Sequence, residues 1–133
     1  MHTTNYRETL ILPSPDCPAT TASVPEKAGS VAAMQHMRLS EGPYKLSSDD
    51  LLFDVYAERN AVAIDEREEA REAFFSKGQA CLRASPLVKT FGWALHHDAQ
   101  GRVALVDPES ETFAALASRD NVTKLLGMRS KRA

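Results

Sequence analysis

A hairpin signature in the C-terminal half of the chain limits the folds that this sequence can adopt. The apolar segments GWALHHD (92–98) and RVALVD (102–107) flank the tetrapeptide 98–101, which begins with Asp and ends with Gly, as a type I turn prefers. Two strands joined by so short a turn pair antiparallel. The sequence therefore predicts an antiparallel β-sheet that contains this hairpin.

Helical patterns dominate the first half of the chain. Apolar residues recur three and four positions apart in segments 31–39, 48–60 and 65–75, and serines stand before the first two of these segments as N-caps. A further helix is expected at 109–118 and a further strand at 7–12. Strands do not alternate with long helices, which argues against a doubly wound parallel sheet. The predicted class is α+β, with several helices packed on one face of a small, mostly antiparallel sheet.

Size and composition indicate one domain. The chain has 133 residues, of which 43% are apolar and 26% charged, enough for one hydrophobic core. We expect a single domain over residues 1–133, with an extended surface loop rich in Pro, Thr and Ser at 13–29 and a basic tail at 129–133. The longest apolar run, FAALA at 113–117, is far shorter than the roughly 20 residues that a membrane span needs. The first residues lack the apolar segment of a secretory signal, so we expect a cytoplasmic protein.

Charge is unevenly distributed along the chain. The 16 Lys and Arg against 18 Asp and Glu give a net charge of −2, which argues against a wholly nucleic-acid-binding domain. Residues 1–70 carry 6 basic and 12 acidic side chains, whereas residues 71–133 carry 10 basic and 6 acidic ones. The basic half favours an anionic partner, and a nucleic-acid-binding module in this half is one alternative. Attraction between the two halves of one domain, or a homodimer in which the acidic half of one copy meets the basic half of another, explains the same split.

Alternation of small and polar residues predicts the main candidate site. Residues 79–84, QACLRA, read as a strand that sends Cys81 and Arg83 to the side of the sheet away from the core. His96 of the hairpin points to that same side. Ser85 then caps a helical turn, whose free backbone N–H groups suit an anion. We therefore expect a small anionic ligand, a carboxylate or a phosphate, bound by Lys77, Arg83, Ser85, Lys89 and His96.

The same arrangement suits nucleophilic catalysis. Cys81 would act as a thiolate, His96 as its base, and Arg83 would favour the charged sulfur. A buried, inert thiol and a serine that merely caps a helix are the simpler interpretations, so enzymatic activity stays open. The two cysteines, Cys17 and Cys81, have no CxxC spacing, and His96 with Asp98 lacks a third ligand. We expect neither a metal nor another cofactor.

Long runs of this sequence resemble a known family. They are SKGQACLRASPLVKTFGWALHHDAQGRVAL at 76–105, HTTNY at 2–6, DCP at 16–18, SSDDLLF at 47–53, YAERN at 56–60 and MRSKRA at 128–133. Over nearly its whole length the chain resembles the family catalogued as a domain of unknown function, number six thousand one hundred and fifty-seven. The resemblance implies a small single-domain protein, and it brings with it no activity, cofactor or catalytic residue.

Overall fold

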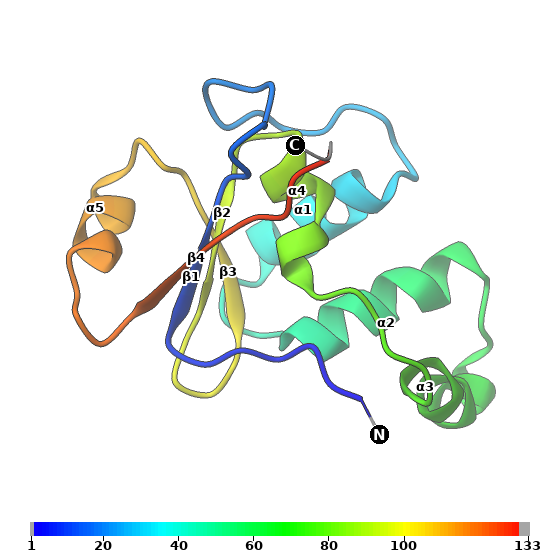
Figure 1. Ribbon diagram of the computed structural model, residues 1–133. Helices are drawn as coiled ribbons and strands as arrows, with labels where there is room; N and C mark the ends of the chain where they lie inside the picture. The colour runs from blue at the N-terminus through cyan, green and yellow to red at the C-terminus, as the bar shows by residue number, and fades with distance from the viewer. Residues whose placement is uncertain (1, 131–133) are drawn as a thin grey trace.

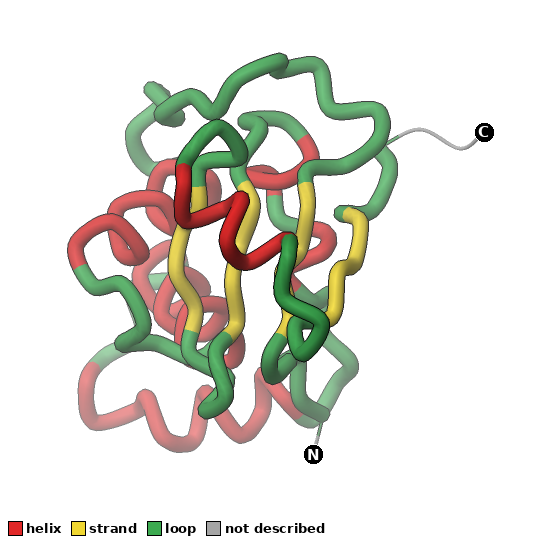
Figure 2. Tube along the Cα trace, turned by 90° about the vertical axis from the view of Figure 1, so that its left-hand side faces the viewer, coloured by secondary structure: helices red, strands yellow, loops and turns green. Residues whose placement is uncertain are grey.

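A four-stranded sheet with the order β3-β2-β1-β4 forms the centre of the molecule (Figures 1 and 2). Its strands are β1 (Thr9–Leu12), β2 (Ala94–His97), β3 (Val103–Val106) and β4 (Thr123–Leu126). β1 pairs antiparallel with β2 and parallel with β4, and β2 pairs antiparallel with β3. The computed structural model describes residues 2–130, so the end of the predicted basic tail lies outside the described residues. The predicted α+β class with a mostly antiparallel sheet is confirmed.

The predicted hairpin is present between β2 and β3. Gly101 N donates a hydrogen bond to Asp98 O at 3.0 Å, which closes the turn. The Asp98 carboxylate reinforces it, because its Oδ1 accepts from the backbone N–H groups of Gln100 and Arg102, both at 2.9 Å. Gly101 has φ +80°, a conformation that residues with a Cβ rarely adopt. Asp and Gly at these positions therefore set the register of the hairpin.

The helices lie close to their predicted positions. They are α1 (Val31–Glu41), α2 (Ser48–Arg59), α3 (Arg67–Phe75), α4 (Pro86–Lys89) and α5 (Glu111–Ala117). Serine side chains cap α1, α2, α4 and α5, each accepting a hydrogen bond from a backbone N–H of the first turn. Local capping chemistry thus explains where most of the helices begin.

Helices cover both faces of the sheet, whereas the sequence predicted helices on one face. α1, α2 and α4 pack over one face, here called the α1–α4 face, and α3 packs against α2. α5 lies across the opposite face, here called the α5 face (Figures 1 and 2). The reason lies in β1, where the adjacent residues Leu10 and Ile11 point to opposite faces and are both 0% exposed. Both faces are apolar, so both have to be covered.

The predicted strand at 79–84 is wrong. Residues 79–81 have no regular secondary structure, and Leu82–Ala84 form one turn of 3-10 helix, η2, which leads into α4. Two of the three inward positions of the predicted strand are alanines, which pack as well in a turn as in a strand. Ser85 and Pro86, an N-cap and a first helical residue, then turn the chain into α4. Both sides of β1 are also already paired, with β2 and β4.

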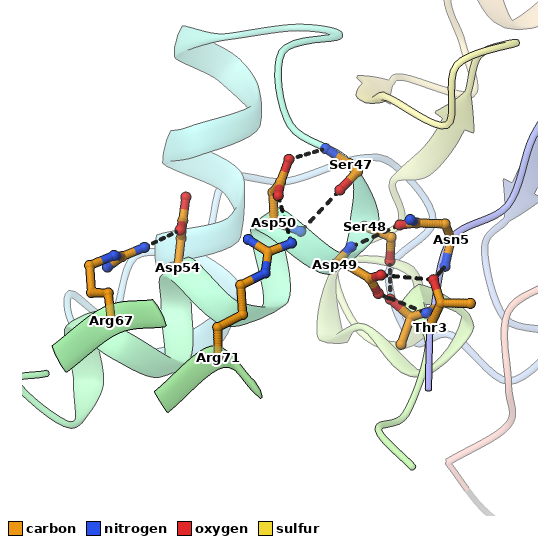
Figure 3. Close-up of polar contacts among 10 residues, drawn as sticks. Thr3, Asn5, Ser47, Ser48, Asp49, Asp50, Asp54, Arg67 and Arg71 are labelled. Carbon is orange, nitrogen blue, oxygen red and sulfur yellow. Dashed lines mark hydrogen bonds and ion pairs between the residues drawn. The ribbon is translucent and has the colours of Figure 1, made fainter. Parts of the chain in front are cut away.

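The N-terminal segment is tied to the start of α2 through one buried carboxylate (Figure 3). Asp49, which is 5% exposed, accepts hydrogen bonds from Thr3 Oγ1, Thr4 N and Thr4 Oγ1, each at 2.7 Å. In return, Asp49 N donates to Asn5 Oδ1 at 3.0 Å. Because these bonds hold residues 3–5, a few positions before β1 begins, they fix how the chain approaches the sheet.

One described ion pair joins the acidic and the basic half of the chain. Arg71 Nη2 in α3 lies 2.8 Å from Asp50 Oδ1 in α2 (Figure 3). The other two described pairs lie within the acidic half, and one of them joins Arg67 to Asp54 at 2.6 Å. This pair is exposed, so it contributes about 1 kcal/mol or less to stability.

Replacing the buried carboxylate is expected to destabilise the protein strongly. Asp49→Ala leaves the buried Thr4 N–H without an acceptor and removes the bonds from the Thr3 and Thr4 hydroxyls, so we expect a loss of about 3 kcal/mol in the free energy of unfolding. Urea denaturation measures it, with Asp120→Ala as the control, because Asp120 is an exposed acid in a loop. Equal midpoints for the two variants would contradict the assigned role of Asp49.

Candidate functional site

The two predicted catalytic residues, Cys81 and His96, lie on opposite faces of the sheet. In β2, Leu95 packs in the core of the α1–α4 face and Ala94 in the core of the α5 face. Side chains alternate along a strand, so His96 shares the α5 face with Ala94. Cys81 Sγ lies 3.2 Å from Tyr6 Oη, and Tyr6 packs against the core of the α1–α4 face. The predicted pairing of a Cys81 thiolate with a His96 base is not formed.

Ser85 is buried, and its hydroxyl is occupied inside the protein. It is 4% exposed, and its Oγ accepts a hydrogen bond from Leu87 N at 3.1 Å, which confirms the predicted N-cap. The same hydroxyl donates to Gln35 Oε1 at 2.6 Å. α4 is a single turn of four residues. The Ser85 hydroxyl, which was expected to bind an anion at this helix start, is thus bonded to Gln35 and to Leu87 N.

Lys77 and Lys89 lie in different parts of the chain from Arg83, which is in η2. Lys77 is exposed beyond the end of α3, where it lines a shallow groove of about 500 Å³ together with Tyr56 and Phe74. Lys89 is half-buried at the end of α4. Because His96 lies on the other face of the sheet and Ser85 is bonded internally, the five predicted residues do not form one site.

The structure does bring Cys81 and Arg83 together, at the side chain of Tyr6. Burial and the hydrogen bond to Cys81 raise the pKa of Tyr6, while the nearby guanidinium of Arg83 opposes this rise. Arg83 Nε donates to Leu126 O at 2.8 Å, and Arg83 O accepts from Met128 N at 2.7 Å. Tyr6, Cys81 and Arg83 are here called the Tyr6 cluster. The 3-10 turn η2, and not the predicted strand, brings Cys81 and Arg83 to Tyr6.

His96 has a different partner, Tyr44. Tyr44 Oη lies 2.7 Å from His96 Nδ1, and the histidine is 6% exposed. Its Nε2 is buried and has no hydrogen-bond partner in the part of the chain that the structure describes. Burial lowers the pKa of His96; the carboxylates of Glu8 and Asp98 act to raise this pKa, and Arg119 acts to lower it. The ring is therefore neutral near neutral pH.

His97, the next residue of β2, is fully buried in the α1–α4 layer. It is 0% exposed, and among the described residues neither ring nitrogen makes a hydrogen bond of ordinary geometry. The edge of its ring contacts Tyr6, with the ring centroids 5.5 Å apart. Burial, together with the neighbouring His96, lowers the pKa of His97 to about 4. This residue resists protonation for as long as the fold is intact.

Sequence reasoning missed both tyrosines of these clusters. Tyr6 and Tyr44 lie in irregular segments, before β1 and after α1 respectively. Their partners are 75 and 52 positions away in the chain. Tyr44 follows Gly42-Pro43, where the sequence marks only a turn. No local pattern of residues signals either contact.

In residues 2–130, no three His, Cys, Asp or Glu side chains are grouped as a metal site requires. The helices of the same residues are too short or too polar to cross a bilayer.

Acid is expected to destabilise the protein through His97. The unfolded chain binds this proton near the ordinary pKa of 6.5, whereas the folded protein binds it near 4. Stability is thus fully present above 6.5 and is lost as the pH falls toward 4, by about 3 kcal/mol. Urea denaturation at about pH 7 and at about pH 4 measures the loss, which His97→Phe should largely remove. An equal loss in both proteins would show that another group is responsible.

Comparisons with known proteins place the chain in a family. A family model described as a family of unknown function, DUF6157, matches residues 1–133, which is the whole chain. No curated protein and no solved structure matches it. The match agrees with the resemblance of the long sequence runs 76–105 and 2–6. The chain belongs to this family of unknown function, DUF6157.

Proposed function

We propose that this protein binds a small anionic ligand at the Tyr6 cluster. The observation that carries the proposal is the fixed guanidinium of Arg83. Its Nε is bound to Leu126 O, and its backbone carbonyl is bound to Met128 N, so both ends of the residue are held. A side chain that is already ordered loses little conformational entropy when it binds a ligand.

The positive charge of Arg83 is available for an anion, and the nearby Tyr6 hydroxyl with which its guanidinium interacts is neutral. No carboxylate among the described residues forms an ion pair with this side chain. A guanidinium presents paired N–H donors that match the oxygens of a carboxylate or a phosphate. Arg83 is half-buried, which strengthens its attraction for an anion relative to a fully solvated arginine.

Tyr6 and Cys81 add one neutral donor beside this charge. The raised pKa of Tyr6 keeps its hydroxyl protonated at neutral pH. The half-buried thiol of Cys81 lies 3.2 Å from that hydroxyl, and when the thiol donates to Tyr6 Oη, the phenol proton is left for a bound oxygen. One arginine with one neutral donor suits a small ligand. A nucleic-acid backbone instead calls for several exposed cations in a row.

Arg83→Gln is expected to abolish stabilisation by inorganic phosphate. A ligand that binds only the folded state raises the melting temperature in proportion to RT ln(1 + [L]/Kd). Thermal unfolding with and without phosphate, at an ionic strength matched with NaCl, gives this increment for each protein. We compare the increase in melting temperature caused by phosphate, and not the melting temperature itself, because Arg83→Gln also removes the bond to Leu126 O and lowers the starting stability.

Arg102→Gln is the matched control, since Arg102 is an exposed arginine just after the hairpin turn. It should keep the phosphate increment of the parent protein. The proposal fails if Arg83→Gln keeps it too, or if phosphate stabilises no protein beyond the NaCl reference.

A further inference from the structure

A buried hydrogen-bonding atom without a partner marks a second place on the molecule, on the α5 face. His96 is 6% exposed, and its Nε2 makes no hydrogen bond within the described residues. Leaving such a group unsatisfied costs about 1 to 3 kcal/mol. Buried polar groups in native proteins almost always have a partner, which is a protein atom, a water or a ligand.

The direction of the hydrogen bond between Tyr44 and His96 Nδ1 decides whether His96 Nε2 is a donor or an acceptor. Burial raises the pKa of Tyr44, so its hydroxyl keeps its proton, and its described hydrogen-bond partner is His96 Nδ1 at 2.7 Å. When the phenol donates to Nδ1, the proton of the neutral ring is on Nε2. With the bond in that direction, Nε2 is an N–H donor, and the group that would satisfy it is an acceptor.

The charges around the ring favour a neutral acceptor. Glu8 lies opposite Asp98 in the sheet, where Glu8 N donates to Asp98 O at 3.1 Å, and both carboxylates act on the His96 ring. Arg119, in the loop after α5, is the cation that acts on the ring. Two negative charges against one positive charge disfavour a further anion. A carbonyl oxygen accepts a hydrogen bond without adding charge.

The charged side chains of Glu8 and Arg119, which act on the His96 ring, are movable. Arg119 is exposed and Glu8 half-buried, and no described hydrogen bond or ion pair holds either side chain. Exposed side chains change rotamer within nanoseconds.

Two residues that act on His96 have strained backbone conformations. Glu8 has φ +49° and Tyr44 has φ +59°, values that non-glycine residues seldom adopt. The other such residue among those described is Ala61, after α2. Strain of this kind persists where surrounding structure holds a side chain in a required position. Two of the three strained residues thus flank one histidine.

We propose that His96, positioned by Tyr44, binds the carbonyl oxygen of a small neutral molecule through Nε2–H. The neutral imidazole acts as the hydrogen-bond donor, and the Tyr44 hydroxyl holds the ring in the tautomer that the donor needs. The site is independent of the Tyr6 cluster, because the two lie on opposite faces of the sheet.

NMR of protein labelled with ¹⁵N in its histidines tests the proposal at about pH 7.5, where the ring is neutral. Two-bond and three-bond couplings between ring nitrogens and protons report the tautomer, and we expect the proton of His96 on Nε2. Acetamide is the neutral carbonyl probe and acetate the charged one. We expect acetamide to shift the His96 nitrogen signals saturably, while the half-buried His36 in α1 serves as the internal reference.

Tyr44→Phe removes the hydrogen bond to Nδ1 and keeps the ring. We expect its His96 to lose the fixed tautomer and to bind acetamide about fivefold to tenfold more weakly. Arg83→Gln should bind acetamide like the parent protein, so failure at the Tyr6 cluster and failure at this site are told apart. If Tyr44→Phe does not fold, the tautomer and titrations of the parent protein decide the question alone.

Three results overturn the proposal. The first is a His96 ring with its proton on Nδ1. The second is no shift of His96 beyond that of His36 with either probe, which leaves an ordered water as the partner of Nε2. The third is a stronger response to acetate than to acetamide, which assigns the atom to an anion.

Discussion

Leu10 and Ile11 are neighbours in the central strand β1, and neither side chain is exposed to water. Successive side chains of a strand point to opposite faces, so this one pair commits the sheet to burial on both sides. The chain meets that demand with α1, α2 and α4 on one face and α5 on the other. Removing either cover would expose an apolar surface at about 25 cal/mol for every square ångström.

Two-sided burial also decides what the histidines of β2 can do. His96 and His97 are consecutive, and strand geometry sends them into different layers. Each loses its contact with water, and burial lowers the pKa of both. His97 is enclosed completely and acts on stability. His96 lies near the end of its strand, where a loop residue, Tyr44, reaches one of its nitrogens.

Arg83 illustrates how one residue serves the sheet and the candidate ligand site together. β4 is an edge strand, and an open edge can pair with another chain. Arg83 bonds to Leu126 O with its side chain and to Met128 N with its backbone carbonyl, which covers the end of this edge. The same bonds hold the guanidinium near Tyr6, whose pKa it acts to lower. Protection of the edge and preorganisation of the cation therefore have a common cause.

Local patterns in the sequence were sufficient for the hairpin, for the serine caps of α1, α2 and α4, and for the α+β class. Each of these depends on residues within a few positions of one another, as Asp98 and Gly101 do in their turn. The strand predicted at 79–84 failed because a short alternation of small residues packs equally well in a turn, and the neighbours of β1 were already β2 and β4. Tyr6 and Tyr44 escaped prediction because each bonds to a residue more than fifty positions away. The packing of distant segments decided the surroundings of Cys81, Arg83 and His96. The sheet is buried on both faces, and it separates the Cys81 thiol on one face from the His96 imidazole on the other.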